Sequence, residues 1–94
     1  MTTPLGAPPA ADELRRTVAG ILGVDPEQIP GDANLVYLGL GSLEVMRLAT
    51  GWRRAGLAVP FADLAADPSL DAWAARLAEA WAAQRGPDAR GGAG

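Results

Sequence analysis

The apolar residues of this chain recur at the spacing of an α-helix, and this periodicity limits the folds open to it more than any other feature. The cleanest example lies near the C-terminus, where four large apolar residues stand at i, i+3, i+7 and i+11: Leu70, Trp73, Leu77 and Trp81. Ser69 directly precedes them and is a suitable N-cap, and Asp71 places negative charge in the first turn. The pattern predicts a helix that begins after Ser69 and ends near Gln84.

An earlier segment, residues 12–22, shows the same periodicity. Its apolar stripe consists of Leu14, Val18, Ile21 and Leu22. Gly23 follows the stripe and is a typical helix stop. A shorter helix of one or two turns is predicted over residues 61–66, after Pro60 and with Leu64 as its anchor in the core.

A further long helix, the second in chain order, is predicted over residues 42–54, and Gly56 lies just beyond its end. The apolar residues of this helix cover too wide an arc to be buried as one stripe. Leu48 and Trp52 are separated by one turn and are expected to face the core, whereas Met46 is expected to stay at the surface.

The connection between the helices predicted over residues 12–22 and 42–54 is rich in Pro, Gly, Asp and Asn, which are turn formers. Residues 25–28 are typical of one helical turn, with an aspartate cap and a proline at the first position. We expect Ile29, Leu35 and Leu38 to hold the connection on the core, and Tyr37 to pack over it. A connection of this length in a small domain indicates a functional loop.

No segment alternates in the manner of a β-strand. The predicted fold is therefore all-α: a small four-helix bundle with three main helices, one short helix and a long loop between the first two. We expect the folded domain to span residues 11–84, a size at which a single core is only just sufficient. The flanking segments, 1–10 and 85–94, are rich in Pro and Gly and are expected to be disordered tails.

The composition excludes several classes of function. The chain has no cysteine and no histidine, which removes disulfides, thiolate metal sites and the usual base for activating a serine. We therefore expect no metal, no catalytic residue and no enzyme activity. A net charge of −3 offers no concentrated basic face to nucleic acid.

The sequence also shows no targeting or membrane signal. The N-terminus lacks a basic start followed by an apolar run, so no signal peptide is expected. No apolar stretch approaches the roughly 18 residues that span a bilayer. The expectation is a cytoplasmic monomer with no membrane partner.

One serine stands where the long connection meets the helix predicted over residues 42–54. Gly39 and Gly41 loosen the backbone before Ser42, and Glu44 lies three residues after Gly41, where it can cap the helix. The Ser42 hydroxyl is expected to be exposed, close to backbone N–H groups that favour negative charge. This environment suits a serine that carries a phosphate ester. The alternative is that Ser42 is an ordinary helix cap.

The order of the helices, together with the Leu-Gly-Leu-Gly-Ser-Leu segment that ends at Leu43, resembles the acyl, peptidyl and aryl carrier proteins over residues 11–83. In that family the serine of a Gly-x-Asp-Ser-Leu motif is esterified with 4′-phosphopantetheine, whose thiol carries a substrate as a thioester. The resemblance implies that Ser42 is the attachment point, with Gly41 and Leu43 beside it in the cofactor site. The motif commonly has aspartate at the position of Gly41, and this difference bears on recognition by a phosphopantetheinyl transferase.

The second long helix helps to distinguish the branches of this family. Arg47, Arg53 and Arg54 make it less acidic than is usual for fatty-acid and polyketide carriers, which favours the nonribosomal-peptide branch. Three segments resemble the aryl carrier domains of siderophore pathways in order and spacing: 52–56, 59–64 and 68–73. Some of those domains are fused to an isochorismatase domain, whereas this one is expected to be free-standing.

The resemblance implies a carrier that holds an aryl or aminoacyl group as a thioester on the 4′-phosphopantetheine of Ser42. The implied partners are a phosphopantetheinyl transferase, an adenylation enzyme and a condensation or tailoring enzyme of nonribosomal peptide synthesis. They would dock through Met46, Arg47 and Phe61. Two alternatives stay open: a polyketide-type acyl carrier protein, and an unmodified helical interaction module that uses Met46 and Phe61 without the serine.

Overall fold

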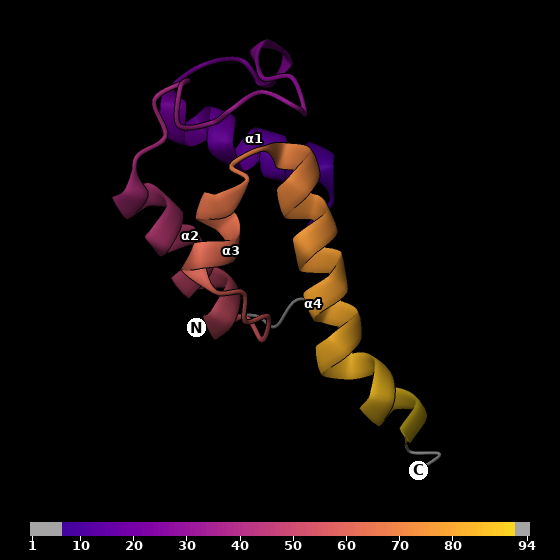
Figure 1. The fold of residues 1–94 in the computed structure, drawn as a ribbon. Helices are drawn as coiled ribbons and strands as arrows, with labels where there is room; N and C mark the ends of the chain where they lie inside the picture. Colours follow the sequence, from indigo (N-terminus) through magenta and orange to yellow (C-terminus); the bar gives the residue numbers. More distant parts are fainter. Residues whose placement is uncertain (1–6, 92–94) are drawn as a thin grey trace.

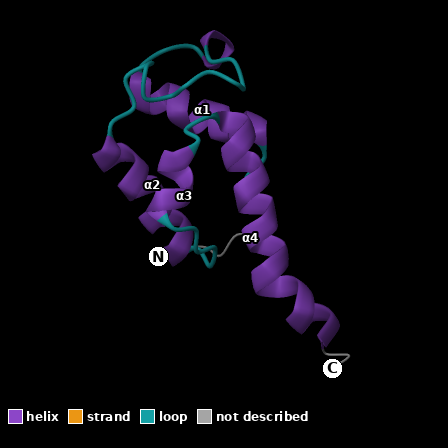
Figure 2. Ribbon diagram, in the orientation of Figure 1, coloured by secondary structure: helices purple, strands orange, loops and turns teal. Residues whose placement is uncertain are grey.

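The computed structural model describes the backbone of residues 7–91 and the side chains of residues 7–84. Within this range four α-helices and one short 3₁₀ turn follow one another: α1 (Ala11–Leu22), η1 (Pro26–Gln28), α2 (Ser42–Arg54), α3 (Phe61–Ala66) and α4 (Leu70–Gly91) (Figure 1). Residues 7–91 contain no strand, and Figure 2 shows helices joined by loops. The predicted all-α fold, with three main helices and one short one, is confirmed.

The last helix is longer than predicted. α4 continues to Gly91, so the end expected near Gln84 is wrong. Once a helix exists, each further residue that has an N–H adds a backbone hydrogen bond. The helix continues past Gly86 and past Pro87, although proline has no N–H to donate. In Figure 1 this part of α4 extends away from the other helices. Neither α4 nor another helix within residues 7–91 is long and apolar enough to cross a membrane.

The tails predicted at residues 1–10 and 85–94 lie partly outside the described residues, which exclude 1–6 and 92–94. At the N-terminal side, Pro9 is buried, so packing on the bundle begins before the first helix. α1 itself starts at the predicted beginning of the domain.

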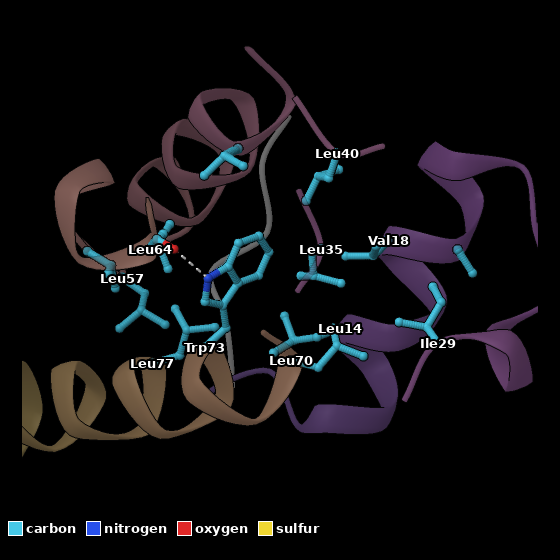
Figure 3. Packing of buried hydrophobic residues seen from close by; sticks show 13 residues of the cluster. Leu14, Val18, Ile29, Leu35, Leu40, Leu57, Leu64, Leu70, Trp73 and Leu77 are labelled. Carbon is cyan, nitrogen blue, oxygen red and sulfur yellow. Dashed lines mark hydrogen bonds between the residues drawn. The ribbon is translucent and has the colours of Figure 1, made fainter. Parts of the chain in front are cut away.

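The core lies between the helices, and Trp73 stands at its centre (Figure 3). The side chains of Leu64, Trp73 and Leu77 are fully buried, as the periodicity of the sequence predicts. Nε1 of Trp73 donates a hydrogen bond to the carbonyl oxygen of Leu64 at 2.9 Å. The Trp73 ring meets that of Trp52 edge to face, with the ring centroids 6.2 Å apart. A large apolar ring is thus buried without leaving its N–H unpaired.

α2 packs its inner face on this core. Leu48 and Trp52 are half-buried against the core, as their spacing predicts. Val45 is the buried residue of the helix, at 3% exposure, and the sequence alone did not distinguish it among the many apolar residues of this segment. Met46 lies at the surface, which confirms its prediction.

The apolar stripe of α1 differs from the prediction at its end. The first two residues of the predicted stripe are buried, but Ala19 is buried as well and Ile21 is 42% exposed. The reason is the loop that covers this end of the helix. A Cβ added to Gly39 would lie 3.6 Å from Cδ2 of Leu22, so the loop packs on Leu22 rather than on Ile21.

The connection between α1 and α2 is held by buried side chains and by backbone bonds to a distant segment. Ile29 and Leu35 are buried, as predicted. The N–H of Leu35 donates to the carbonyl of Pro68 at 2.7 Å, and the N–H of Asp71 donates to the carbonyl of Gly31 at 3.0 Å. These two bonds tie the connection to the junction of α3 and α4.

Leu38 was expected to join this anchor, and that prediction is wrong. Its side chain is 43% exposed, and Leu40 is buried instead. The N–H of Leu40 donates to the carbonyl of Leu35 at 3.0 Å, and Gly39 has a φ of +114° between Leu38 and Leu40. Glycine adopts this conformation without steric strain. The reversal at Gly39 therefore lets Leu40, rather than Leu38, enter the core.

Of the two residues predicted to cap a helix start, Ser69 and Asp25, only Ser69 makes a side-chain capping bond. The N–H of Ala72 donates to Oγ of Ser69 at 3.2 Å, so Ser69 caps α4 as predicted. The turn η1 forms at the predicted place, but Asp25 makes no side-chain capping bond there.

Candidate functional site

Ser42 is the first residue of α2, and its side chain is exposed, as predicted. The N–H of Val45 donates to the carbonyl of Gly41 at 3.1 Å, which begins the backbone hydrogen bonding of the helix. The N–H groups of residues 42–44 precede this bond, so they have no partner within the helix and present partial positive charge around the serine. A negatively charged ester on the Ser42 oxygen would lie in a favourable field.

Glu44 caps the start of α2, as its spacing predicts. The N–H of Gly41 donates to Oε1 of Glu44 at 3.0 Å. Glycine has no side chain, so the reciprocal half of a capping box does not form. A Cβ added to Gly41 would lie 2.7 Å from the same Oε1. The Glu44 carboxylate therefore occupies the space that a larger residue at position 41 would need.

We expect these two positions to be coupled. In the wild-type background, Gly41→Asp should change the free energy of unfolding by less than about 0.5 kcal/mol, because displacement of Glu44 offsets the new cap. In a Glu44→Ala background, the same substitution should stabilise the fold by about 0.5–1 kcal/mol. Urea unfolding of the four proteins in this cycle measures the coupling. Equal effects of Gly41→Asp in both backgrounds would show that the two side chains do not compete.

The turn before Ser42 presents three apolar side chains to solvent. Val36, Tyr37 and Leu38 are 52%, 87% and 43% exposed. Tyr37 was expected to pack over the loop, and that prediction is wrong. Oδ1 of Asn34 accepts hydrogen bonds from the N–H groups of Val36 at 2.9 Å and Tyr37 at 3.3 Å, which closes the turn with these side chains outside. An asparagine directly before an apolar run was the missed signal for this surface.

The outer face of α2 runs from the serine to the C-terminal end of the helix. Six residues at i, i+3, i+4, i+7, i+8 and i+11 line a groove along it: Leu43, Met46, Arg47, Thr50, Gly51 and Arg54. Leu43 and Met46 are 55% and 48% exposed. Leu43, predicted for the cofactor site, thus shares one face with Met46 and Arg47, predicted for docking.

A second groove lies between α2 and the segment before α3. It is lined by Met46, Ala49, Thr50, Arg53, Ala58, Val59, Pro60 and Phe61. Gln84 of α4 holds this segment, because its Nε2 donates to the carbonyl of Ala58 at 2.8 Å and its Oε1 accepts from the N–H of Ala58 at 3.1 Å. Met46 borders both grooves, whereas Arg47 and the half-buried Phe61 lie in different ones.

Among the described side chains, the exposed hydroxyl of Ser42 can accept a group that another protein transfers to it. Within residues 7–84, no group of three or more His, Cys, Asp or Glu side chains could hold a metal ion. The carboxylate nearest to Ser42 in the chain, that of Glu44, accepts a hydrogen bond from the Gly41 backbone. An exposed hydroxyl with apolar surface beside it suits a serine that another protein modifies.

Comparison with known proteins agrees with this geometry. Residues 12–77 match the family model described as a phosphopantetheine attachment site. The phenyloxazoline synthase MbtB of Mycolicibacterium paratuberculosis is 46% identical over 68 residues, which make up 72% of this chain and 6% of the synthase. The isochorismatase of Bacillus subtilis is 36% identical over 62 residues, 66% of this chain and 20% of that protein. The acyl carrier protein ScoB of Streptomyces coeruleorubidus is 36% identical over 67 residues, 71% of this chain and 79% of that carrier.

The lengths of these relatives differ greatly. This chain spans only a small part of the synthase and of the isochorismatase, but most of the acyl carrier protein. Domains of the matched family hold 4′-phosphopantetheine covalently and act as carriers rather than as catalysts, in agreement with the predicted cofactor and with the prediction of a carrier domain that is not itself an enzyme. Because the match covers most of the sequence and the helical fold agrees with it, the chain belongs to the family of phosphopantetheine-dependent carrier proteins.

Proposed function

We propose that the Ser42 hydroxyl is the attachment point of 4′-phosphopantetheine, with Gly41 and Leu43 on either side. The observation that carries this proposal is the exposure of Ser42 at the start of α2, within the region that matches the family. The other serine of the sequence, Ser69, is 8% exposed, and its Oγ accepts a hydrogen bond from the N–H of Ala72. Of the two serines, Ser42 therefore has the more accessible hydroxyl.

The residues around Ser42 fit this group. Gly41 has no side chain to cover the serine, and the free N–H groups at the start of α2 favour the negative charge of a phosphodiester. When bound, the group supplies a thiol that holds an acyl cargo as a thioester. The contribution of the chain is to hold the group at its surface and to present α2 to a partner. Tethering raises the concentration of the cargo near each partner site without any catalytic residue in the carrier.

We further infer that the cargo is an aryl or aminoacyl group used in nonribosomal peptide synthesis. The 46% identity to a phenyloxazoline synthase supports an aryl cargo, because a phenyloxazoline contains an aryl ring. In this proposal, a phosphopantetheinyl transferase modifies Ser42 and an adenylation enzyme loads the thiol. A condensation or tailoring enzyme then receives the cargo, and the partners dock around Met46, Arg47 and Phe61.

A second candidate is a polyketide-type acyl carrier. The similarity to an acyl carrier protein, over 79% of that protein, favours it. The two functions differ in the enzyme that loads the thiol. An adenylating enzyme for aryl or amino acids, supplied with ATP, should load the modified protein if the first proposal is right, and a malonyl transferase with malonyl-coenzyme A should load it if the second is right.

Intact mass spectrometry tests the attachment of phosphopantetheine, the step that both candidate functions share. After incubation with coenzyme A, magnesium and a promiscuous phosphopantetheinyl transferase, the protein should gain the mass of one phosphopantetheinyl group. The reason is the accessibility of Ser42 in the folded protein. No gain of mass, under conditions that fully modify a control carrier, would favour an unmodified interaction module instead.

A further inference from the structure

The turn that precedes Ser42 presents an aromatic ring to solvent. Within residues 7–84, Tyr37 is the only aromatic residue that is exposed, since each tryptophan and Phe61 is buried or half-buried. Val36 and Leu38, on either side of Tyr37, are exposed as well. Single exposed apolar residues are common on protein surfaces, whereas three together beside an attachment point indicate a contact surface.

The backbone of this turn is held by its own hydrogen bonds. Besides the two bonds to Oδ1 of Asn34, the carbonyl of Asn34 accepts from the N–H groups of Tyr37 at 3.1 Å and Leu38 at 3.3 Å. The N–H of Gly39 donates to the carbonyl of Val36 at 3.0 Å. A surface that is already ordered loses less entropy when it binds. The three side chains are thus presented in a preorganised arrangement.

The turn is the tip of a short loop whose base lies next to Ser42. The N–H of Leu40 donates to the carbonyl of Leu35 at 3.0 Å, and both side chains point into the core (Figure 3). Only Gly41 separates Leu40 from Ser42. Five fully extended residues span at most about 18 Å, and this folded segment spans less, so Tyr37 lies within that distance of Ser42. An extended phosphopantetheine group is of comparable length.

We propose that Val36, Tyr37 and Leu38, called here the apolar turn, form a resting site for the aryl end of the cargo that Ser42 carries. The aryl ring packs against the ring of Tyr37, and the two aliphatic neighbours add apolar contact. Pairs of aromatic rings attract one another beyond the effect of the area that they bury. The inference rests on the proposed function, because it requires an aryl thioester on 4′-phosphopantetheine.

The tether determines how weak this contact can be and still matter. A short flexible tether holds its far end at an effective concentration of about millimolar. A contact with a dissociation constant in the same range therefore keeps the cargo on the apolar turn roughly half of the time. The resting cargo is shielded from water, and the remainder is free to enter a partner enzyme. Hydrolysis of the thioester should then be slowed about twofold.

The first test uses Tyr37 as its own probe, because the sequence contains a single tyrosine. The protein is produced with 3-fluorotyrosine, and a promiscuous transferase modifies it from coenzyme A, benzoyl-coenzyme A or cyclohexanecarbonyl-coenzyme A. We expect the fluorine resonance of the benzoyl form to shift from that of the form without cargo, because an aromatic ring shifts the nuclei packed against it. The cyclohexanecarbonyl form, whose ring has the same size but no π system, should shift it less.

The second test follows hydrolysis of the benzoyl thioester by intact mass, with no partner enzyme present. Tyr37→Ser should lose benzoate about twofold faster than wild type, and Tyr37→Phe, which keeps the ring, should match wild type. Leu38→Ser and Met46→Ser are a matched pair, since these residues stand four positions before and after Ser42 and are similarly exposed. Leu38→Ser should speed hydrolysis and Met46→Ser should not. Urea unfolding confirms that each variant is folded.

The outcomes separate this inference from the proposed function. If the wild type gains no phosphopantetheine, the proposed function fails, and the inference fails with it. If Ser42 is modified, three results would overturn the inference alone: the same fluorine resonance with and without the benzoyl group, unchanged hydrolysis in Tyr37→Ser, or faster hydrolysis only in Met46→Ser.

Two further results would assign the apolar turn to another occupant and would also overturn the inference. A fluorine shift that grows with protein concentration would mean that the cargo reaches the turn of a second copy. A resonance that is unmoved by the cargo and shifts only when the transferase is added would mean that the turn contacts a partner protein.

Discussion

Ser42→Ala should abolish the gain of mass from coenzyme A completely, while the free energy of unfolding stays within about 0.5 kcal/mol of wild type. The side chain is exposed and makes no hydrogen bond to another described residue, and alanine is a strong helix former. The substitution therefore removes the acceptor oxygen and little else. Intact mass after transferase treatment, together with urea unfolding, measures both parts of this expectation.

Ser69→Ala is the matched control for this experiment. It removes the only other serine, whose Oγ caps α4, and should lower the free energy of unfolding by about 1 kcal/mol. It should nevertheless be modified as fully as wild type. Modification that survives Ser42→Ala, or that is lost in folded Ser69→Ala, would place the attachment point elsewhere.

Trp73→Ala should lower the free energy of unfolding by about 3–5 kcal/mol, far more than the loss of either serine. The ring is fully buried, bonds the carbonyl of Leu64 and contacts Trp52 edge to face. A small domain has a total stability of roughly 5–15 kcal/mol, so this loss should leave a substantial unfolded fraction. Thermal and urea unfolding by circular dichroism should show a marked fall in both midpoints.

Trp73→Phe distinguishes the stability contributed by the buried ring from the stability contributed by its hydrogen bond. Phenylalanine retains most of the apolar volume but leaves the Leu64 carbonyl without its donor, so we expect a loss of about 1–3 kcal/mol. A phenylalanine variant as unstable as the alanine variant would mean that the hydrogen bond, and not the buried ring, dominates the contribution of Trp73.

The parts of the fold that sequence reasoning recovered are those decided locally. The stripe that leads from Leu70 to Leu77 follows from helical geometry alone, and the cap at Ser69 depends on atoms within one turn. The bond from the Gly41 N–H to Glu44 is equally local. For the same reason the exposure of Ser42 at the start of α2 could be predicted from neighbouring residues.

The parts that it missed depend on distant segments. Ile21 and Leu38 both fit an apolar pattern, but Gly39 places the loop over Leu22 and turns Leu40 inward. No local rule indicates which of two apolar neighbours will be covered by a loop. The end of α4 was missed for another reason, since the helix continues past Gly86 and Pro87, two residue types that commonly mark a helix end.

The residues predicted for partner docking show the same difference between features that depend on local sequence and features that depend on distant segments. The exposure of Met46 follows from the excess of apolar residues in its own helix, and it was predicted. The separation of Arg47 and Phe61 into two grooves was not predicted, because it depends on the segment before α3. Gln84 fixes that segment by pairing with Ala58 across 26 positions of sequence, a contact that no periodicity reveals.

The two backbone bonds that tie the long connection to the α3–α4 junction have a mechanical consequence. Because the backbone of Leu35 is hydrogen-bonded to Pro68 and that of Asp71 to Gly31, the connection is fixed to the helical bundle and does not act as a hinge. A group on Ser42 would then swing from a fixed pivot. The volume that the far end of this group can reach is set by the length of the group and by the orientation of α2 relative to the other helices.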